Sequence, residues 1–223
     1  MTNGLPNVVR IGVVGDVHVE DERLERGLSV LKKLGVDAIL CVGDVVDGPG
    51  DLERCVAALE AETAYVIKGN HERWLLAGEM RSLPHATPSV SGPLRATISA
   101  WPTTLDFATP LGNLRLAHGV DDDDMAELRT DTRGYALQAI PRLRELMLDP
   151  EVTFHLGGHT HERMARAFPG LVTLNAGTLS GDDPTVMHID FAEKKIVHIS
   201  VATSDPKPVA ELALPDPLPI PRV

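Results

Sequence analysis

Aromatic side chains are scarce in this sequence, which has two Trp, two Tyr and four Phe among its 223 residues. A hydrophobic core must therefore be built from Val, Leu, Ile and Ala. Cysteine is scarcer still, because Cys41 and Cys55 are too few for a disulfide-based scaffold. No stretch approaches the roughly 18 consecutive apolar residues that cross a bilayer, and MTNGLPNVVR lacks the apolar segment of a secretory signal. We therefore expect a cytoplasmic protein without a membrane partner.

Positive charge is also in short supply, since 21 Lys and Arg face 32 Asp and Glu and leave a formal net charge of −11. A surface of this sign repels a polyanion on average, which argues against nucleic acid as a partner. The hydrophobic fraction of 43% suffices for one large domain with a sizeable core. The composition also leaves a homo-oligomer open.

The first 70 residues alternate between apolar runs and charged amphipathic stretches. VVRIGVVGD, DAILCVGD and TAYVIKGN are short and rich in β-branched residues, which predicts three strands. Residues 21–33, residues 51–60 and the segment that begins HERWLL predict helices. A β-α-β-α-β order implies parallel strands that are buried on both faces.

The second half of the chain is richer in strands. TTLDFATPLGNLRLAHG predicts a hairpin, and further strands are expected at 152–156, 163–168, 171–174, 185–190 and 196–201. One helix is predicted over 133–148. This change of pattern indicates a second, mixed sheet packed on the first, within a domain of residues 1–204. Six prolines fall in the last nineteen residues, so we expect 205–223 to form an extended tail outside the core.

The sequence GGHTHE at 157–162 places two histidines one residue apart behind two glycines. A helical zinc motif needs His-Glu-x-x-His, but Ala165 stands where its second histidine would be. Residues two apart share a face only in an extended segment, so we expect extended backbone here. The partners of His159 and His161 must then lie elsewhere in the chain.

Metal-capable side chains follow the early strands, each time directly after a glycine. The three stretches are GDVH at 15–18, GDVVD at 43–47 and GNHE at 69–72. Parallel strands present their carboxyl ends at one edge of a sheet. The residues expected to meet there are Asp16, His18, Asp44, Asn70 and His71, joined by His118 from the end of LRLAHG.

The combined set of side chains offers oxygen and nitrogen ligands and no sulfur. This chemistry suits Mn, Fe, Co, Ni or Zn in a catalytic centre rather than a structural thiolate zinc site. Two carboxylates, one amide and four imidazoles exceed the needs of one catalytic metal with an open position. They fit two metal ions that share one bridging carboxylate.

Together these stretches resemble the calcineurin-like metallophosphoesterase family. Its pattern is D-x-H, G-D-x-x-D, G-N-H-[DE], a lone His before Gly, and G-H-x-H, and all five appear here in order. Each alone is a common turn or helix cap, whereas five in order, each after a strand, are specific. The resemblance extends from Ile11 to about Val201. It implies a four-layer α/β/β/α sandwich, with two mixed β-sheets flanked by helices.

The resemblance also implies a role for each matching residue. The first metal would be held by Asp16, His18 and His161, and the second by Asn70, His118 and His159, with Asp44 as the bridge. Manganese is the expected metal, and iron, nickel, cobalt or zinc are the alternatives. His71 would be the catalytic histidine beside the phosphate or leaving group, with Asp47 holding its ring.

Such a centre implies a phosphoesterase that attacks phosphorus with a hydroxide bridging the two metals, while His71 assists the leaving oxygen. The phosphoprotein-phosphatase branch carries an Arg after G-D-x-x-D, but Gly48 stands there. The chain therefore resembles the small bacterial phosphodiesterase branch, and we expect small phosphodiesters as substrates. A phosphomonoesterase, a non-catalytic scaffold and a nuclease are the alternatives. Scaffold members have lost ligands or the catalytic histidine, and this chain retains them all.

Residues 75–99 and 121–150 lie between the motifs and are expected to shape the pocket. Arg73 follows the GNHE stretch closely enough to be a candidate phosphate ligand. Trp74 could stack on a nucleobase, although its helical spacing favours a core position. His85 is expected in an ordinary loop.

Three further features have structural interpretations. The sequence DDDD at 121–124 is predicted to begin a helix, where carboxylates interact favourably with the helix dipole. His155 alternates with apolar neighbours and is expected to be a hydrogen-bonded strand histidine. His198, in the terminal hairpin, is expected at the surface.

Overall fold

The first strands of the chain are parallel, as their alternation with helices predicts. The computed structural model describes residues 5–79 and 81–220. In it, β1 (Arg10–Val14), α1 (Asp21–Lys33), β2 (Ala38–Cys41), α2 (Leu52–Ala61) and β3 (Tyr65–Val66) follow one another. β1 pairs with β2 and β2 with β3, both in parallel. Asp51 caps α2 by accepting a hydrogen bond from the Arg54 N–H at 3.0 Å, so this predicted helix begins as its sequence indicates.

The same sheet continues with strands from the end of the chain. These are β9 (Thr185–Asp190), β10 (Lys195–Ser200) and β11 (Lys207–Ala213), and the six-stranded order is β11-β10-β9-β1-β2-β3. β9 runs antiparallel to β1, and the two later strands continue antiparallel to their neighbours. The sheet is therefore mixed, with its parallel strands at one side.

A second mixed sheet is built from the middle of the chain. It contains β4 (Thr104–Thr109), β5 (Gly112–Ala117), β6 (Phe154–Gly157), β7 (Arg163–Phe168) and β8 (Leu171–Ala176), in the order β4-β5-β6-β8-β7. β5, β6 and β8 are parallel to one another, whereas β4 and β7 close the two edges in the antiparallel sense.

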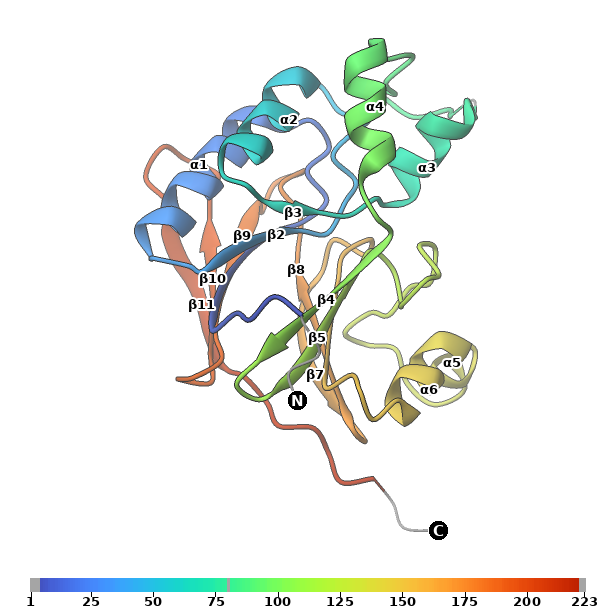
Figure 1. Ribbon diagram of the computed structural model, residues 1–223, viewed down its shortest axis with the longest axis vertical. Coiled ribbons are helices and arrows are strands. Elements are labelled where there is room, and N and C mark those ends of the chain that lie inside the picture. The colour runs from blue at the N-terminus through green and yellow to red at the C-terminus, as the bar shows by residue number, and fades with distance from the viewer. Residues whose placement is uncertain (1–4, 80, 221–223) are drawn as a thin grey trace.

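The two sheets pack face to face, with helices on both outer sides (Figure 1). The core between the sheets is mainly aliphatic and includes Val13, Leu116, Leu156 and Leu174. α1 and α2 cover the outer face of the six-stranded sheet, while α5 (Tyr135–Gln138) and α6 (Pro141–Leu148) lie on the side of the five-stranded sheet (Figure 1). The predicted four-layer sandwich of two mixed sheets flanked by helices is confirmed.

Two helical segments differ from the predicted ones. The helix expected over 133–148 is divided into α5 and α6, because Pro141 has no N–H to continue a helix and is instead the first residue of α6. α4 (Gly92–Ala100) was not predicted; Ser91 caps it by accepting from the Leu94 N–H at 3.4 Å. It follows α3 (Asn70–Ala77), and the segment between these two helices lies beside the site described below.

The C-terminal segment is extended, as its prolines predict, but the expectation that it lies outside the core is wrong. β11 pairs along β10 from Lys207 to Ala213 and forms the edge of the six-stranded sheet. Leu214 then inserts into the core between the sheets and is 3% exposed. Apolar residues such as Leu214 allow this segment to pack on the core despite its prolines. An edge strand tolerates proline because one of its sides has no partner strand. The sheet thus extends beyond residue 204.

No helix within 5–79 and 81–220 has the length and apolar character needed to span a membrane.

Candidate metal centre

The predicted ligands follow parallel strands of the two sheets; all lie in loops except Asn70, which is the first residue of α3. Asp16 and His18 follow β1, Asp44 follows β2 and Asn70 follows β3, while the loops after β5 and β6 carry His118 and the histidines at 159 and 161. Contacts join the two sets across the sandwich: the His159 N–H donates to Asp16 Oδ1 at 2.9 Å, and His118 Nδ1 donates to the Val42 carbonyl at 2.7 Å. The structure thus brings all seven predicted ligands to one edge.

The first group consists of Asp16, His18 and His161, whose ligand atoms lie within 4.8 Å of one another. The Nε2 atoms of His18 and His161 are 3.2 Å apart, and His161 Nε2 is 3.7 Å from Asp16 Oδ1. His18 Nδ1 donates to the Asp47 carbonyl at 3.2 Å, which leaves Nε2 as the nitrogen with a free lone pair. Asp16 is fully buried, and its Oδ2 has no hydrogen-bond partner among residues 5–79 and 81–220.

The second group is formed by Asn70, His118 and His159, with Asp44 beside them. Asn70 Oδ1 lies 2.9 Å from His118 Nε2 and 3.0 Å from His159 Nδ1. Asp44 Oδ2 is 3.1 Å from the same His118 nitrogen. His118 Nδ1 donates to the Val42 carbonyl at 2.7 Å, so this ring too presents Nε2 to the cluster.

The electrostatics of these groups fit bound cations. Burial raises the pKa of Asp16 to about 7, although the charge of His118 acts in the opposite direction. Asp44 is also buried, which by itself would raise its pKa, but His118 and the other nearby histidines outweigh burial and hold that pKa below its usual range. The same carboxylate raises the pKa of His118 to about 10 against the opposing effect of burial. Convergent lone pairs, one of them unpartnered, suit divalent metals with O/N ligands.

The backbone at this edge is strained. Six predicted site residues have positive φ angles: Asp16 (45°), His18 (44°), Asp44 (50°), Asp47 (62°), His159 (65°) and His161 (60°). Non-glycine residues seldom adopt this left-handed region, and they cluster at functional sites when they do. The extended backbone expected for GGHTHE is therefore wrong, since β6 ends at Gly157 and both histidines lie in a turn. The turn directs them to different groups instead of a single point.

His71 and Asp47 form a pair at the edge of the cluster. His71 Nδ1 lies 2.8 Å from Asp47 Oδ2, while His71 Nε2 is 3.8 Å from Asp44 Oδ2. Burial alone would lower the pKa of His71, but its hydrogen bond to Asp47 and the charge of Asp44 raise it overall. His18, Asp44 and His71 also meet the distance criterion for a third ligand group, so distance alone leaves His71 within reach of a metal.

Two residues that the sequence did not point to complete the environment of Asp47. Arg81 contacts both carboxylate oxygens, with Nε at 2.8 Å and Nη2 at 3.0 Å. The Thr87 N–H donates to Asp47 Oδ1 at 2.7 Å. These donors and His71 outweigh burial and lower the pKa of Asp47 to about 2. Neither residue belongs to a motif or a periodic pattern, so the sequence held no signal for them.

Glu72 is a further residue whose role was not predicted. It is fully buried, and its carboxylate accepts from the N–H groups of Asp44 (2.9 Å), Val45 (2.7 Å), Val46 (3.0 Å) and Gly69 (2.8 Å). Glu72 thereby joins the loop after β2 to the start of α3. Its place as the last residue of GNHE was the signal that could have identified it.

Gly48 has a structural explanation. A Cβ atom at this position would collide with the backbone carbonyl of His18 and lie 3.1 Å from Cβ of Val19. The two loops approach this closely because the His18 and Val19 N–H groups donate to the Asp44 and Val45 carbonyls at 2.8 and 2.9 Å. The glycine therefore reflects packing of the loops, and it is not by itself evidence of space for a substrate.

A pocket of about 510 Å³ opens over the ligand cluster. Beside the cluster residues, it is lined by Pro49, Trp74, Leu83, Pro84 and His85. Trp74 is half-buried at this wall, with its ring 4.9 Å from that of His71, so its expected core position is wrong. The described lining includes no Lys or Arg. The pocket thus combines an apolar wall with the ligand cluster at its base.

The aspartates at 121–124 form a turn with ion pairs, and the helix predicted to begin there is absent from the described chain. Val120 and Asp123 make an isolated bridge in this turn. Arg73 contacts both carboxylate oxygens of Asp124, at 2.7 and 3.0 Å. This pairing occupies the guanidinium that the sequence suggested as a phosphate ligand.

Two histidines outside the cluster are buried. His155 is 3% exposed and accepts a hydrogen bond from the Asp121 N–H at 3.3 Å, as expected for a hydrogen-bonded strand histidine. His198 is 1% exposed, so its expected surface position is wrong. It lies opposite Met187 on β9, on the face of the sheet that packs against the second sheet. The terminal hairpin belongs to the six-stranded sheet, and the short sequence of the hairpin did not indicate which of its faces is buried.

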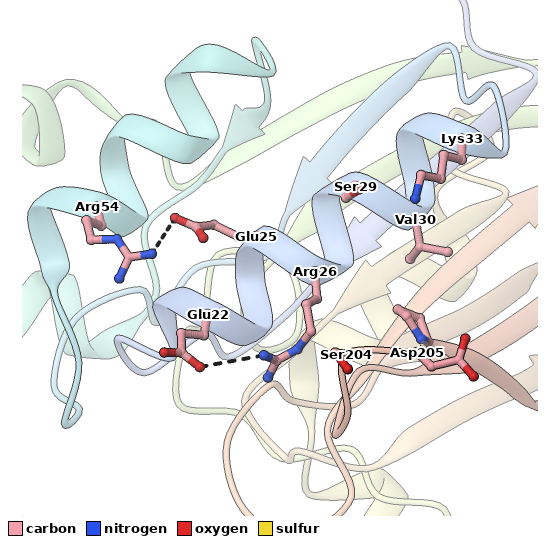
Figure 2. A pocket seen from close by; sticks show the side chains of 10 residues that line it. Glu22, Glu25, Arg26, Ser29, Val30, Lys33, Arg54, Ser204 and Asp205 are labelled. Carbon is pink, nitrogen blue, oxygen red and sulfur yellow. Dashed lines mark hydrogen bonds and ion pairs between the residues drawn. The ribbon is translucent and has the colours of Figure 1, made fainter.

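A second hollow, of about 660 Å³, lies along α1 and contains none of the predicted site residues (Figure 2). Its lining is charged, and Figure 2 shows ion pairs between Arg26 and Glu22 (3.6 Å) and between Arg54 and Glu25 (2.8 Å). The Glu22 side chain is 75% exposed, so this hollow is a solvated face whose charges compensate one another.

Comparison with known proteins gives consistent results. A sequence model described as calcineurin-like phosphoesterase matches residues 9–163. An uncharacterised protein of Methanocaldococcus jannaschii, MJ0912, is 30% identical over 69 residues, which are 31% of this chain and 28% of that protein. The match therefore spans less than a third of either protein.

Solved structures show the same fold. The phosphoesterase YfcE from E. coli has a TM-score of 0.56 at 15% identity, over 92% of this chain and 100% of that chain. An archaeal phosphodiesterase has a TM-score of 0.55 at 15% identity, over 86% and 99% of the two chains. Identities of 15% support a similarity of fold and nothing more. The sequence model of the family, in contrast, matches more than half of the chain. This protein belongs to the calcineurin-like phosphoesterases, a family of hydrolases that normally use divalent metals.

Proposed function

We propose that this protein is a binuclear metal-dependent phosphodiesterase that acts on small phosphodiesters. The observation that carries the proposal is the position of Asp44, whose carboxylate lies within ligand distance of His18 from the first group and of His118 and His159 from the second. The His71–Asp47 pair lies beside it. One carboxylate shared between two groups is the arrangement expected of a two-metal hydrolytic site.

The chain's residues divide between the two ions in the proposed centre. One metal would be held by Asp16, His18 and His161, the other by Asn70, His118 and His159, and Asp44 would contact both. When bound, two divalent cations polarise a phosphoryl oxygen and lower the pKa of a coordinated water towards about 7. Manganese is the metal we propose, and iron, nickel, cobalt and zinc suit the same oxygen and nitrogen donors.

His71 would supply the proton in this reaction. Its Nδ1–H donates to Asp47, which leaves Nε2 directed towards the cluster, 3.8 Å from Asp44 Oδ2. The hydrogen bond to Asp47 and the charge of Asp44 raise the pKa of His71, which increases the protonated fraction of the ring at any given pH. The proton on Nε2 can then pass to the leaving oxygen or stabilise the charge that develops there.

The pocket above the cluster supports a diester as substrate. A diester carries one negative charge and a second organic arm, whereas a monoester is a dianion at neutral pH and benefits from more positive charge. Arg73 and Arg81, the nearby guanidinium groups described above, are both paired with carboxylates. Pro49, Trp74, Leu83 and Pro84 offer an apolar wall to an organic arm. The likeness to an archaeal phosphodiesterase agrees with this proposal at the level of the fold.

A phosphomonoesterase is the second candidate, because the metal ligands and His71 serve either reaction. A non-catalytic scaffold is disfavoured, since every predicted ligand and the His71–Asp47 pair are retained. The acidic composition, with a net charge of −11, also disfavours a nuclease that follows a long polyanion.

The discriminating experiment compares matched esters under several metals. Protein stripped of metal and reloaded with Mn, Ni, Co or Zn is assayed with bis-p-nitrophenyl phosphate and p-nitrophenyl phosphate, and the His71→Ala variant serves as a control for contaminating activity. We expect kcat/KM for the diester to exceed that for the monoester under the best metal. A monoester preference of tenfold or more, about 1.4 kcal/mol of transition-state free energy, would make the protein a phosphatase. Failure to hydrolyse either ester under all four metals would contradict the proposed enzyme.

A further inference from the structure

We propose that Arg81 is a positioning residue for the catalytic pair, which fixes the Asp47 carboxylate and, through it, the orientation of the His71 ring. The inference rests on the proposed phosphoesterase function and adds a residue that lies outside every motif of the site. Three observations support it: the contacts of Arg81, the four hydrogen bonds that the Asp47 carboxylate accepts, and the close packing at Gly48.

Four of the five N–H groups of the Arg81 guanidinium have an acceptor, and the side chain is 7% exposed. Nε and Nη2 donate to the two oxygens of Asp47 at 2.8 and 3.0 Å. Nη1 and Nη2 also donate to the main-chain carbonyls of Glu79 and Thr87, both at 2.9 Å. A two-point contact between planar groups sets the plane of the carboxylate as well as its position.

The Asp47 carboxylate is saturated by these contacts. Its Oδ2 lies 2.8 Å from both Arg81 Nε and His71 Nδ1, while Oδ1 accepts from Arg81 Nη2 and the Thr87 N–H. The Asp47 side chain is 1% exposed, so solvent cannot replace a lost donor easily. Without Arg81, two of the four hydrogen bonds disappear, and the carboxylate can rotate away from the plane in which it holds His71.

Arg81 reaches Asp47 from a segment that also shapes the pocket. No side chain at position 48 could do so, because a Cβ there would collide with the His18 backbone. Arg81 instead comes from residues 78–91, between α3 and α4, which also supply Leu83, Pro84 and His85 to the pocket lining. The contact with Asp47 therefore joins the apolar wall to the catalytic pair.

The chain contains a matched control for this contact. Arg115 makes the same two-point contact with Asp106, at 2.9 and 3.1 Å, in the hairpin of β4 and β5. Neither residue lines the pocket over the cluster. Loss of Arg115 removes this ion pair, together with a longer one to Asp121 (3.3 Å), without touching Asp47 or His71.

The kinetic test uses Arg81→Met, Arg81→Lys and the control Arg115→Met. Each is assayed with bis-p-nitrophenyl phosphate, whose leaving group needs little protonation, and with diphenyl phosphate, whose leaving group needs more. We expect Arg81→Met to lower kcat for diphenyl phosphate by about tenfold more than for the nitrophenyl ester, since proton donation is impaired. KM and metal content should stay within about twofold of wild type. The loss of kcat in Arg81→Lys should be intermediate, because lysine keeps the positive charge but cannot make the two-point contact with Asp47.

A double-mutant comparison tests whether Arg81 acts through His71. In the His71→Ala background, Arg81→Met should change kcat by less than about twofold. If Arg81 acts only through His71, its substitution has no further effect once the imidazole is removed. Equal losses for both esters, an undiminished loss in that background, or a change in KM alone would each overturn the proposal.

A spectroscopic test is independent of activity and so separates this inference from the proposed function. The NMR signal of the His71 Nδ1–H, assigned by its absence in His71→Ala, should be sharp in wild type and in Arg115→Met. It should be broadened or lost in Arg81→Met and, to a lesser degree, in Arg81→Lys. An unchanged sharp signal in a folded Arg81 variant overturns the proposal, even if the protein hydrolyses no ester. Arg81→Lys supplies the measurement if Arg81→Met does not fold.

Discussion

The Nε2 atoms of His18 and His161 lie 3.2 Å apart, although 143 residues separate them in the sequence. One follows β1 of the six-stranded sheet and the other follows β6 of the five-stranded sheet. The buried Asp16 beside them has an oxygen without a hydrogen-bond partner in the described part of the chain. Leaving such lone pairs uncompensated is costly, so folding of the two sheets together assembles a candidate cation site.

We therefore expect two metal ions per chain. Elemental analysis of protein that has been stripped and reloaded should approach this ratio, and the melting temperature should rise on reloading because ligands that bind only the folded state stabilise it. Asp44→Asn should reduce the metal content, since Asp44 is proposed to contact both ions. A plateau at one metal that Asp44→Asn leaves unchanged would contradict the bridging role.

His71→Ala should separate catalysis from metal binding. We expect kcat to fall by about 10²–10⁴, the usual range for a positioned proton donor, with metal content near that of wild type. Asp47→Asn should give a smaller defect of the same kind. His71 lies within ligand distance of His18 and Asp44. Loss of metal together with activity would therefore identify His71 as a ligand.

The gathering of the predicted ligands could be foreseen from the sequence because two local signals coincide. Short β-branched runs predict the parallel strands, and a glycine at the end of each run places Asp16, Asp44 and Asn70 at the edge where such strands end. The pairing of strands then brings these residues together, whatever their separation in the chain. The structure agrees with this part of the analysis in both sheets.

Other features of the site had no such signal. Arg81 lies 34 residues after Asp47, in an irregular segment whose path depends on tertiary packing. The turn that carries His159 and His161 has positive φ angles, and the residue types at these positions do not indicate such a conformation. Trp74 shows the spacing of a core residue, yet its side chain lines the pocket. Local patterns identified the ligands, whereas the pocket wall and the support of the catalytic pair depend on the whole fold.

Truncation after Ser204 should lower stability, because it removes the strand β11 and the buried Leu214. Loss of a buried Leu side chain alone costs about 2–5 kcal/mol, and the exposed edge of β10 would add to this. Truncation after Pro215 is the control, since it keeps both features. Chemical denaturation of the two shortened proteins measures the difference. Equal stability of both would show that β11 contributes nothing to the fold.

His198→Leu should stabilise the protein at pH 7. The ring is 1% exposed, and neither of its nitrogens has a hydrogen-bond partner within the described residues. An unsatisfied buried polar group costs about 1–3 kcal/mol, which an apolar side chain of similar size avoids. His198→Gln keeps a polar group at the site and should not be stabilised. Urea denaturation at pH 7 measures all three proteins.

The same residue should make stability depend on pH. Burial lowers the pKa of His198 from 6.5 to about 4, and the charge of Arg163 acts in the same direction. The folded state therefore keeps the ring neutral while the unfolded chain takes up a proton, so stability is fully present above pH 6.5 and is lost as the pH falls towards 4. This single group can account for at most about 3 kcal/mol. Both His198→Leu and His198→Gln should remove the contribution of this residue to the pH dependence of the free energy of unfolding. Each variant is compared with wild type under identical metal loading. A slope identical to that of wild type in both variants would show that His198 is hydrated or already paired in solution.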